Sequence, residues 1–243
     1  MKNHLPFINV YEKKNLKSKI STQLLYGETF KKTKRIGSWI KIKNDIDGYS
    51  GFVKNNKFPT NCNNTHKVSN LFASLYLKPN SKYKTNKKLS FGSRIKIIKK
   101  SGHFYKFDNF WIKKNELKEV NYKANDIFKN INKFMGIKYK WGGKHFNGVD
   151  CSGLIQLFFN FNNRFCPRDA SDQVKYFKKK VKLKNINKNN LIFWKGHVAL
   201  TISSKKLIHA YGPFKKIVIM PISKTIDRIE KTANLKVIGI RRF

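Results

Sequence analysis

One stretch of the chain is apolar at almost every position. Leu154, Leu157, Phe158 and Phe161 recur at helical spacing, and Ile155 and Phe159 extend the same surface around the helix axis. A helix with so little polar surface has to be covered on most sides by other elements. The sequence therefore predicts a central, mostly buried helix that starts near Cys151.

The first part of the chain alternates apolar and polar residues over short segments. Three β-rich segments are separated by Gly and Asn/Asp turn signals: Gln23–Glu28, Ser38–Ile42 and Gly48–Val53. About five short strands fit between residues 18 and 58, which is typical of a small barrel. We place this predicted barrel in residues 1–60.

A polar break, Thr60–Thr65, precedes a second and less regular set of apolar segments. These segments are Ala73–Pro79, Ser93–Ile98, Phe104–Phe107 and Phe110–Ile112. They predict a second small barrel in residues 65–120.

A short helix is expected between the barrels and the rest of the chain. It would run over Asp126–Met135, with Asn125 as its cap and Gly136 at its end. Its apolar stripe would consist of Ile127, Phe128, Ile131, Phe134 and Met135.

Two alternating segments in the C-terminal third predict an antiparallel hairpin. They are His197–Ile202 and Lys206–Tyr211, joined across Ser203–Lys205. Because side chains alternate between faces, the loop length decides whether the two histidines share a face. A three-residue loop places His209 opposite Ala199 and diagonal to His197, and we predict that register.

Cys151 follows a glycine-rich loop and lies at the predicted start of the central helix. A thiol there meets free backbone N–H groups and the positive end of the helix dipole, which favour thiolate over thiol. A lone free cysteine is more often a small buried apolar residue. The two downstream histidines and the flanking Asp150 and Ser152 favour a nucleophile instead, because a reactive thiol needs a general base nearby.

The motifs around these residues resemble a known family. They comprise Tyr139–Gly143, Gly148–Leu154, His197–Ala199, Pro167–Gln173 and Ile208–Ala210. Together they resemble the NlpC/P60 cysteine peptidases, which cut peptidoglycan peptides. The segments of the first barrel resemble the bacterial SH3 domains that precede such peptidases. The resemblance implies an α+β fold: a papain-like NlpC/P60 module in residues 124–243, behind two small SH3-like β-barrels.

The resemblance also implies roles for individual residues. Cys151 would be the nucleophile, His197 its general base, and His209 the residue that orients the base. Asp150 and Ser152 would hold the free amino end of the substrate, although Asp150 is also a good helix N-cap. The Tyr139 hydroxyl would lie near the tetrahedral intermediate.

Three further residues are predicted to contribute to substrate binding. Glu28 and Tyr49 of the first barrel would restrict the cleft to peptides with a free N-terminal L-Ala. The alternative for Glu28 is a solvated turn residue. Arg168, in the motif Pro167–Gln173, is assigned to the same group. Two departures from the family pattern, Asn190 and Ala199, leave the reaction class unchanged but bear on substrate preference.

Charge and cysteine content narrow the possible partners. Lys and Arg number 53 against 13 Asp and Glu, a net charge of +40. Lysine is spread through every segment and arginine is scarce, so specific nucleic-acid binding ranks below peptidase activity. Cys62, Cys151 and Cys166 show no CxxC spacing, which indicates neither a disulfide framework nor a zinc site. We expect no metal or other cofactor.

The N-terminus lacks a continuous apolar segment, and no apolar run approaches membrane-spanning length. The expected location is the cytoplasm. The expected function is hydrolysis of the γ-D-glutamyl bond to a diamino acid in peptidoglycan stem peptides, during recycling of muropeptides with free N-terminal L-Ala. Two alternatives stay open: a non-catalytic binder of cell wall or polyanions, and a Cys–His amidase or acyltransferase acting on another substrate.

Overall fold

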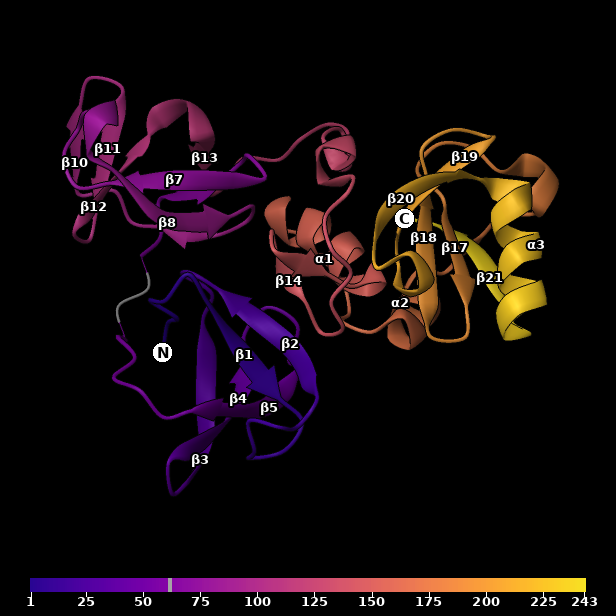
Figure 1. Ribbon diagram of the computed structural model, residues 1–243, viewed down its shortest axis with the longest axis horizontal. Coiled ribbons are helices and arrows are strands. Elements are labelled where there is room, and N and C mark those ends of the chain that lie inside the picture. Colours follow the sequence, from indigo (N-terminus) through magenta and orange to yellow (C-terminus); the bar gives the residue numbers. More distant parts are fainter. Residues whose placement is uncertain (61–62) are drawn as a thin grey trace.

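The structure is a computed structural model that describes residues 1–60 and 63–243. Helix α1 lies between two N-terminal β-rich units on one side and a six-stranded sheet on the other (Figure 1). Cys62, one of the three cysteines considered above, lies outside the described residues, as does part of the predicted polar break. Among the described residues, no helix is long and apolar enough to cross a membrane.

The first unit is a five-stranded antiparallel sheet with strand order β2-β1-β5-β4-β3. Its strands are β1 (Phe7–Tyr11), β2 (Ile20–Leu25), β3 (Phe30–Ile36), β4 (Trp39–Asn44) and β5 (Ser50–Lys54). The three predicted β-rich segments overlap β2, β4 and β5. Alternate residues of these strands enclose a small apolar core that includes Val10, Leu24, Phe30, Ile42 and Val53.

The second unit contains a five-stranded sheet, β10-β11-β12-β7-β8, and a three-stranded sheet, β13-β6-β9. Its strands are β6 (His66–Val68), β7 (Phe72–Tyr76), β8 (Lys84–Ser90), β9 (Arg94–Ile95), β10 (Lys99–Ser101), β11 (Phe104–Phe107), β12 (Phe110–Lys113) and β13 (Leu117–Glu119). Two 3-10 turns, η1 (Ser81–Tyr83) and η2 (Lys114–Glu116), connect them. Tyr26 of the first unit is buried in the core of the second.

Closed barrels are not confirmed in either unit. Within the described residues, the outer strands β2 and β3 of the first sheet do not pair with each other, and neither do β10 and β8 of the second. Both sheets are therefore open. The second unit also divides its strands between two separate sheets, which the sequence pattern did not predict.

The predicted helix over Asp126–Met135 is wrong. This segment forms turns and one 3-10 turn, η3 (Ile131–Phe134). Asp126 Oδ1 accepts a hydrogen bond from the Phe128 backbone N–H at 3.0 Å, a local turn that competes with helix formation. The predicted apolar side chains are buried except for Met135, which is 56% exposed.

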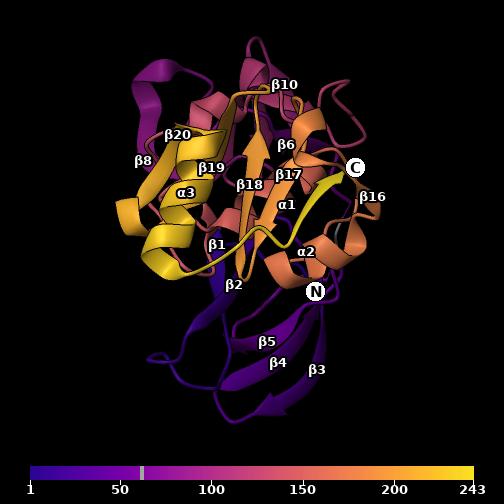
Figure 2. The same ribbon diagram turned by 90° about the vertical axis from the view of Figure 1, so that its right-hand side faces the viewer.

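Helix α1 (Cys151–Phe161) is buried along its whole length, as predicted. It packs on a six-stranded sheet of order β16-β21-β17-β18-β19-β20, whose other face is covered by α3 (Figures 1 and 2). On the side away from this sheet, α1 shares a core with Leu25 of the first unit and Phe91 of the second. The mixed helix and sheet content agrees with the expected α+β class.

The remaining elements of this part complete the sheet and its flanks. They are β14 (Lys144–His145), β15 (Gly148–Val149), α2 (Ala170–Tyr176), β16 (Lys179–Lys180), η4 (Leu183–Asn185), β17 (Leu191–Trp194), β18 (His197–Thr201), β19 (Lys206–Tyr211), η5 (Gly212–Phe214), β20 (Lys216–Pro221), α3 (Ile222–Ala233) and β21 (Gly239–Arg242).

Two buried lysines join the N-terminal units to the rest of the molecule. Lys144 Nζ forms an ion pair with Glu28 Oε1 at 3.2 Å, and both side chains are almost fully buried. Lys67 Nζ donates to the backbone oxygens of Tyr122 at 2.7 Å and of Phe161 at 2.5 Å. The second contact ties the C-terminal end of α1 to the second unit, because it satisfies a carbonyl of the last helical turn.

Candidate active site

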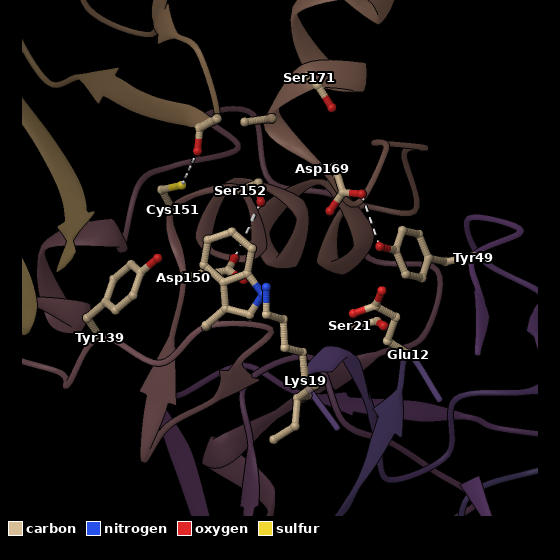
Figure 3. Close-up of a pocket in the computed structure, with 14 residues that line it drawn as sticks. Glu12, Lys19, Ser21, Tyr49, Tyr139, Asp150, Cys151, Ser152, Asp169 and Ser171 are labelled. Carbon is tan, nitrogen blue, oxygen red and sulfur yellow. Dashed lines mark hydrogen bonds between the residues drawn. The ribbon is translucent and has the colours of Figure 1, made fainter. Parts of the chain in front are cut away.

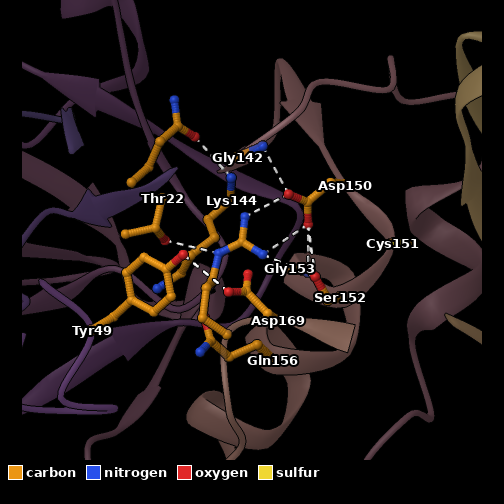
Figure 4. A network of polar contacts seen from close by, with 12 residues as sticks. Thr22, Tyr49, Gly142, Lys144, Asp150, Cys151, Ser152, Gly153, Gln156 and Asp169 are labelled. Atoms are coloured by element: carbon orange, nitrogen blue, oxygen red, sulfur yellow. Dashed lines mark hydrogen bonds and ion pairs between the residues drawn. The ribbon is translucent and has the colours of Figure 1, made fainter. Parts of the chain in front are cut away.

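Cys151 is the first residue of α1, and Asp150 caps the helix. Asp150 Oδ1 accepts a hydrogen bond from the Gly153 backbone N–H at 2.7 Å, and Oδ2 accepts one from Gly142 N–H at 2.8 Å (Figure 4). The cap role considered for Asp150 is therefore present. The same carboxylate fixes the glycine-rich loop against the start of the helix, which sets the position of the thiol.

Gly142 is required at its position for two reasons. Its φ of +72° lies in the left-handed region, and a Cβ built there would lie 2.3 Å from the Ile20 carbonyl oxygen. Any side chain would push the glycine-rich loop away from strand β2. The first unit and the loop before Cys151 are thus in direct backbone contact.

Arg168 does not line the cleft, so its assignment as a substrate-binding residue is corrected. Its guanidinium is buried and forms two hydrogen bonds with Asp150, with Nη1–Oδ1 at 3.0 Å and Nη2–Oδ2 at 2.6 Å. Nη1 also donates to Ser152 Oγ at 3.0 Å, and Nε donates to Thr22 Oγ1 at 2.9 Å (Figure 4). Arg168 is a positioning residue that links the residues on both sides of Cys151 to the first sheet.

A cavity of about 470 Å³ opens in front of Cys151 (Figure 3). Its walls come from both the first unit and the C-terminal part, and comprise Glu12, Lys19, Ile20, Ser21, Tyr49, Tyr139, Trp141, Asp150, Cys151, Ser152, Asp169, Ala170, Ser171 and Gly196. The predicted residues Tyr49, Tyr139, Asp150 and Ser152 are among them. The first unit therefore forms one wall of the cleft.

Glu28 lies away from this cavity, which contradicts its predicted role at the substrate's amino end. It is buried, with Oε2 accepting from Leu25 N–H at 2.9 Å and Oε1 paired with Lys144. The alternative prediction, a solvated turn residue, is also wrong. The carboxylate of the first unit that does face the cavity is Glu12.

Sequence reasoning missed Glu12, Lys19, Asp169 and Ser171. Asp169 accepts a hydrogen bond from the Tyr49 hydroxyl at 3.0 Å, so the two residues join the first unit to the C-terminal part at one side of the cleft (Figure 3). Burial raises the pKa of both groups, and their mutual contact adds to the rise for Tyr49. The sequence did contain one signal for Glu12 and Asp169. Acidic residues are scarce in this basic chain, so each one is a candidate for a specific role.

The predicted hairpin and its register are confirmed. Leu200 pairs with Ile208 and Thr201 with Leu207, and the same register places Ala199 opposite His209. His197 and His209 thereby share a face, with Nε2 of His197 at 2.8 Å from Nδ1 of His209. The His197 ring uses its Nε2 for this contact, so its Nδ1 is the nitrogen not engaged with His209.

Cys151 lies close to the start of β18, the strand that carries His197. Its sulfur donates to the carbonyl oxygen of Gly196 at 4.0 Å (Figure 3). Gly196 immediately precedes His197. The structure therefore places Cys151, at the beginning of α1, close to the start of the strand that carries His197, and His197 contacts His209 of β19.

Comparison with known proteins now identifies the main parts of the chain. Residues 136–231 match the NlpC/P60 family, and residues 6–58 match the bacterial SH3 domain. The chain carries an NlpC/P60 domain. The region that matches the NlpC/P60 family starts two residues after η3 and ends within α3. It includes Cys151, His197 and His209.

Relatives extend this likeness to most of the chain. A gamma-D-glutamyl-L-lysine dipeptidyl-peptidase of Bacillus subtilis is 29% identical over 240 residues, covering 88% of this chain and 80% of that protein. A protein of the same name from Bacillus cereus is 26% identical over 260 residues, covering 93% and 76%. The fold also matches the crystal structure of a NlpC/P60 family protein from Bacillus cereus, whose sequence is 20% identical. The superposition covers 100% of this chain and 98% of the other, with a TM-score of 0.83. The two therefore share their whole fold.

Burial governs the ionisation of the NlpC/P60 site. Burial, and secondarily Asp150, raise the pKa of the Cys151 thiol to about 12, and the nearby backbone N–H groups of Val198 and Ser152 oppose this only in part. Burial lowers the pKa of His197 to about 4 and of His209 to about 3. Desolvation therefore opposes the effect of the helix terminus and favours the neutral thiol in the resting site.

The site contains no cluster suited to a metal. Across residues 1–60 and 63–243, no three His, Cys, Asp or Glu side chains come together in a way that could hold one. Cys166, the other described cysteine, is buried away from the cleft. The chemistry available within the described residues is that of a thiol, two imidazoles, a tyrosine hydroxyl and carboxylates.

Proposed function

We propose that this protein is a cysteine peptidase that hydrolyses the γ-D-glutamyl bond to a diamino acid in peptides derived from peptidoglycan, in wall-peptide recycling or turnover. The observation that carries the proposal is the placement of Cys151 at the start of α1, beside the His197–His209 pair and inside a polar cavity. The names of the two Bacillus relatives support the choice of bond.

The reaction begins from a neutral thiol and a neutral imidazole. As the Cys151 sulfur bonds to the glutamyl carbonyl carbon, its proton passes to His197 Nδ1. The C–N bond then breaks, and His197 gives this proton to the leaving amine, which leaves a thioester. Water attacks the thioester and passes a proton to His197. The S–C bond breaks, the proton returns from His197 to sulfur, and the glutamyl product departs as its γ-carboxylic acid, which releases its remaining proton to water.

Tyr139 is the side chain that we assign to the developing oxyanion. Burial raises the pKa of its hydroxyl, so the group stays protonated and can donate a hydrogen bond throughout the neutral range. The Cys151 backbone N–H at the free end of α1 is the second donor. His209 holds the His197 ring through the 2.8 Å contact.

The charges in the cavity favour a peptide with a free amino end. Glu12 of the first unit and Asp169 of the C-terminal part supply two carboxylates to the cavity, where they can accept an ammonium group. Lys19 lies on the same surface and can pair with the α-carboxylate of the D-glutamyl residue. Glu12 thus takes the role that the sequence assigned to Glu28. A blocked amino terminus would leave the two carboxylates without the ammonium group that balances their charge.

The test is mass spectrometry of products from L-Ala-γ-D-Glu-meso-diaminopimelate and its N-acetylated form. Wild type should release L-Ala-D-Glu from the free-amine peptide only, and Cys151→Ala should release none. The matched control is Cys166→Ala, which replaces a cysteine outside the cleft and should retain cleavage. Cleavage of both peptides would support the peptidase activity but reject the recognition of a free amino terminus. Cleavage that persists in Cys151→Ala, or no cleavage by wild type, would reject the proposal.

A further inference from the structure

A second cavity, also of about 470 Å³, lies beside the first on the far side of His197. Its walls come from the start of β18, from η5 and from α3. They comprise Tyr139, Lys195, Gly196, His197, Tyr211, Gly212, Pro213, Arg228, Ile229, Thr232, Ala233 and Leu235. Tyr139 and Gly196 border both cavities, so the two are neighbours across the catalytic groups.

The nucleophile and the base face different cavities. Cys151 lines the first cavity and His197 lines the second. During acylation the carbonyl carbon moves towards sulfur, whereas the leaving amine must be within reach of the imidazolium that protonates it. The acyl part of the substrate therefore belongs in the first cavity. The amine part belongs in the second.

The second cavity is cationic. Besides the neutral His197, its charged wall residues are Arg228 and Lys195, and no carboxylate lines it. The Arg228 guanidinium lies 4.7 Å above the Phe214 ring, and in the described part of the chain no acidic residue forms an ion pair with it. The nearby Glu230 of α3 faces Lys236 at 4.0 Å. The guanidinium is thus held in place but keeps its hydrogen-bonding edge.

We propose that this cavity binds a carboxylate of the leaving amino acid, with Arg228 as the main contact and Lys195 as the second cation. This inference rests on the proposed function and adds the substrate class: peptides whose third residue carries a free carboxylate on the amine side of the cut bond. That carboxylate has two possible sources. One is the C-terminal α-carboxylate of a tripeptide, and the other is the side-chain carboxylate of a diamino dicarboxylic acid such as diaminopimelate.

The test compares kcat/KM for four tripeptides that share L-Ala-γ-D-Glu. Their third residue is L-lysine, L-lysine α-amide, meso-diaminopimelate or meso-diaminopimelate α-amide. Amidation of the recognised carboxylate should lower kcat/KM about fivefold, mainly by raising KM. A change of this size is what the loss of a partly exposed ion pair produces. A loss of similar size on amidation in both the lysine and the diaminopimelate pair identifies the α-carboxylate. Faster cleavage of both diaminopimelate peptides than of both lysine peptides, with no loss on amidation, identifies the side-chain carboxylate, and equal kcat/KM for all four peptides would overturn the inference.

The variant Arg228→Gln separates this role from a structural one. It should lose about fivefold on the carboxylate-bearing peptides and little on lysine amide. Arg228→Lys should retain part of the preference, and Lys231→Gln, an exposed lysine of the same helix outside the cavity, should match wild type. Equal losses on acid and amide substrates would overturn the inference while leaving the peptidase in place.

A binding measurement keeps the inference testable apart from catalysis. Free meso-diaminopimelate and lysine amide are titrated by ligand-observed NMR into wild type, Arg228→Gln and Lys231→Gln. Stronger binding of diaminopimelate that disappears in Arg228→Gln alone supports the cationic cavity. Binding that is the same in all three proteins overturns it. If wild type cleaves no peptide, the proposed function fails by itself and this titration still decides the cavity's role.

Discussion

The guanidinium of Arg168 and the carboxylate of Asp150 meet in two parallel hydrogen bonds directly beside the nucleophile, at 3.0 and 2.6 Å. Both side chains are buried, so removal of one partner leaves an uncompensated charge. We predict that Arg168→Met lowers the free energy of unfolding by about 3–5 kcal/mol. Chemical denaturation followed by tryptophan fluorescence measures this loss.

The control for this prediction is Arg242→Met, which removes an exposed arginine and should change stability by less than about 0.5 kcal/mol. Arg168→Lys keeps the charge but not the paired geometry, so it should fall between the two. Equal stabilities of Arg168→Met and Arg242→Met would contradict the assigned role of the buried pair.

The buried Glu28–Lys144 pair joins the first sheet to the loop ahead of Cys151. Glu28→Gln leaves the Lys144 ammonium without its counter-charge and should cost about 3 kcal/mol of unfolding free energy. Adding Lys144→Met removes the orphaned charge and should restore more than about 1 kcal/mol, as a double-mutant cycle would measure. Glu230→Gln, from an exposed pair 4.0 Å apart, is the matched control and should be nearly neutral. Strict additivity of the two buried substitutions would argue against the coupling.

The raised pKa of Cys151 predicts slow alkylation at neutral pH. With a pKa of about 12, the thiolate fraction at pH 7 is far below that of a free cysteine. Iodoacetamide should therefore modify Cys151 more than about tenfold slower than free cysteine at pH 7, and the rate should rise without a plateau up to pH 9.5. Peptide mapping by mass spectrometry follows the residue directly. A plateau below pH 8 would instead indicate a thiolate stabilised by His197.

The lowered pKa of His197 predicts activity well into the acid range. The base must be neutral, and burial keeps it so until the pH approaches about 4. The acid limb of kcat/KM that belongs to His197 should then lie nearer pH 4 than pH 6.5. In Cys151→Ala, the NMR signal of the His197 ring should not titrate between pH 8 and pH 5. Titration near pH 6.5 would contradict the buried, neutral state.

Stability should change with pH for the same reason. In the unfolded chain a histidine takes up a proton near pH 6.5, whereas folded His197 and His209 do so only at about pH 4 and pH 3. The unfolded state therefore binds more protons in this window, and the free energy of unfolding should fall as the pH drops from 6.5 towards 4. Thermal unfolding across this range measures the effect. A free energy of unfolding that stays constant between pH 6.5 and pH 4 would contradict this account of the two histidines.

The parts of the site that the sequence predicted depend on short-range patterns. The continuous apolar run fixes α1, and the alternation in the C-terminal third fixes the hairpin that brings His209 beside His197. Both rules involve residues a few positions apart. They were sufficient to predict that Cys151 begins α1 and that the two histidines share a face of the hairpin.

The parts that the sequence did not predict depend on contacts between distant segments. Glu28 and Lys144 are 116 positions apart, and their pairing decides that Glu12 rather than Glu28 faces the cavity. The burial of Arg168 likewise depends on Thr22, 146 positions away. Local polar contacts explain the other failure, since the turn at Asp126 competes with the helix that the apolar spacing favoured. The high pKa of Cys151 follows from how completely the fold covers it, which no local pattern records.

The contact between Arg168 and Thr22 also bears on the order in which the protein is assembled during synthesis. A ribosome releases the N-terminal sheet first, so Thr22 and its strand can fold before Arg168 leaves the exit tunnel. The wall of the cleft that the first sheet provides can then fold before Cys151 is available to line the cleft. The later segment can close around a surface that is already formed, and the reactive groups come together only in the last third of translation.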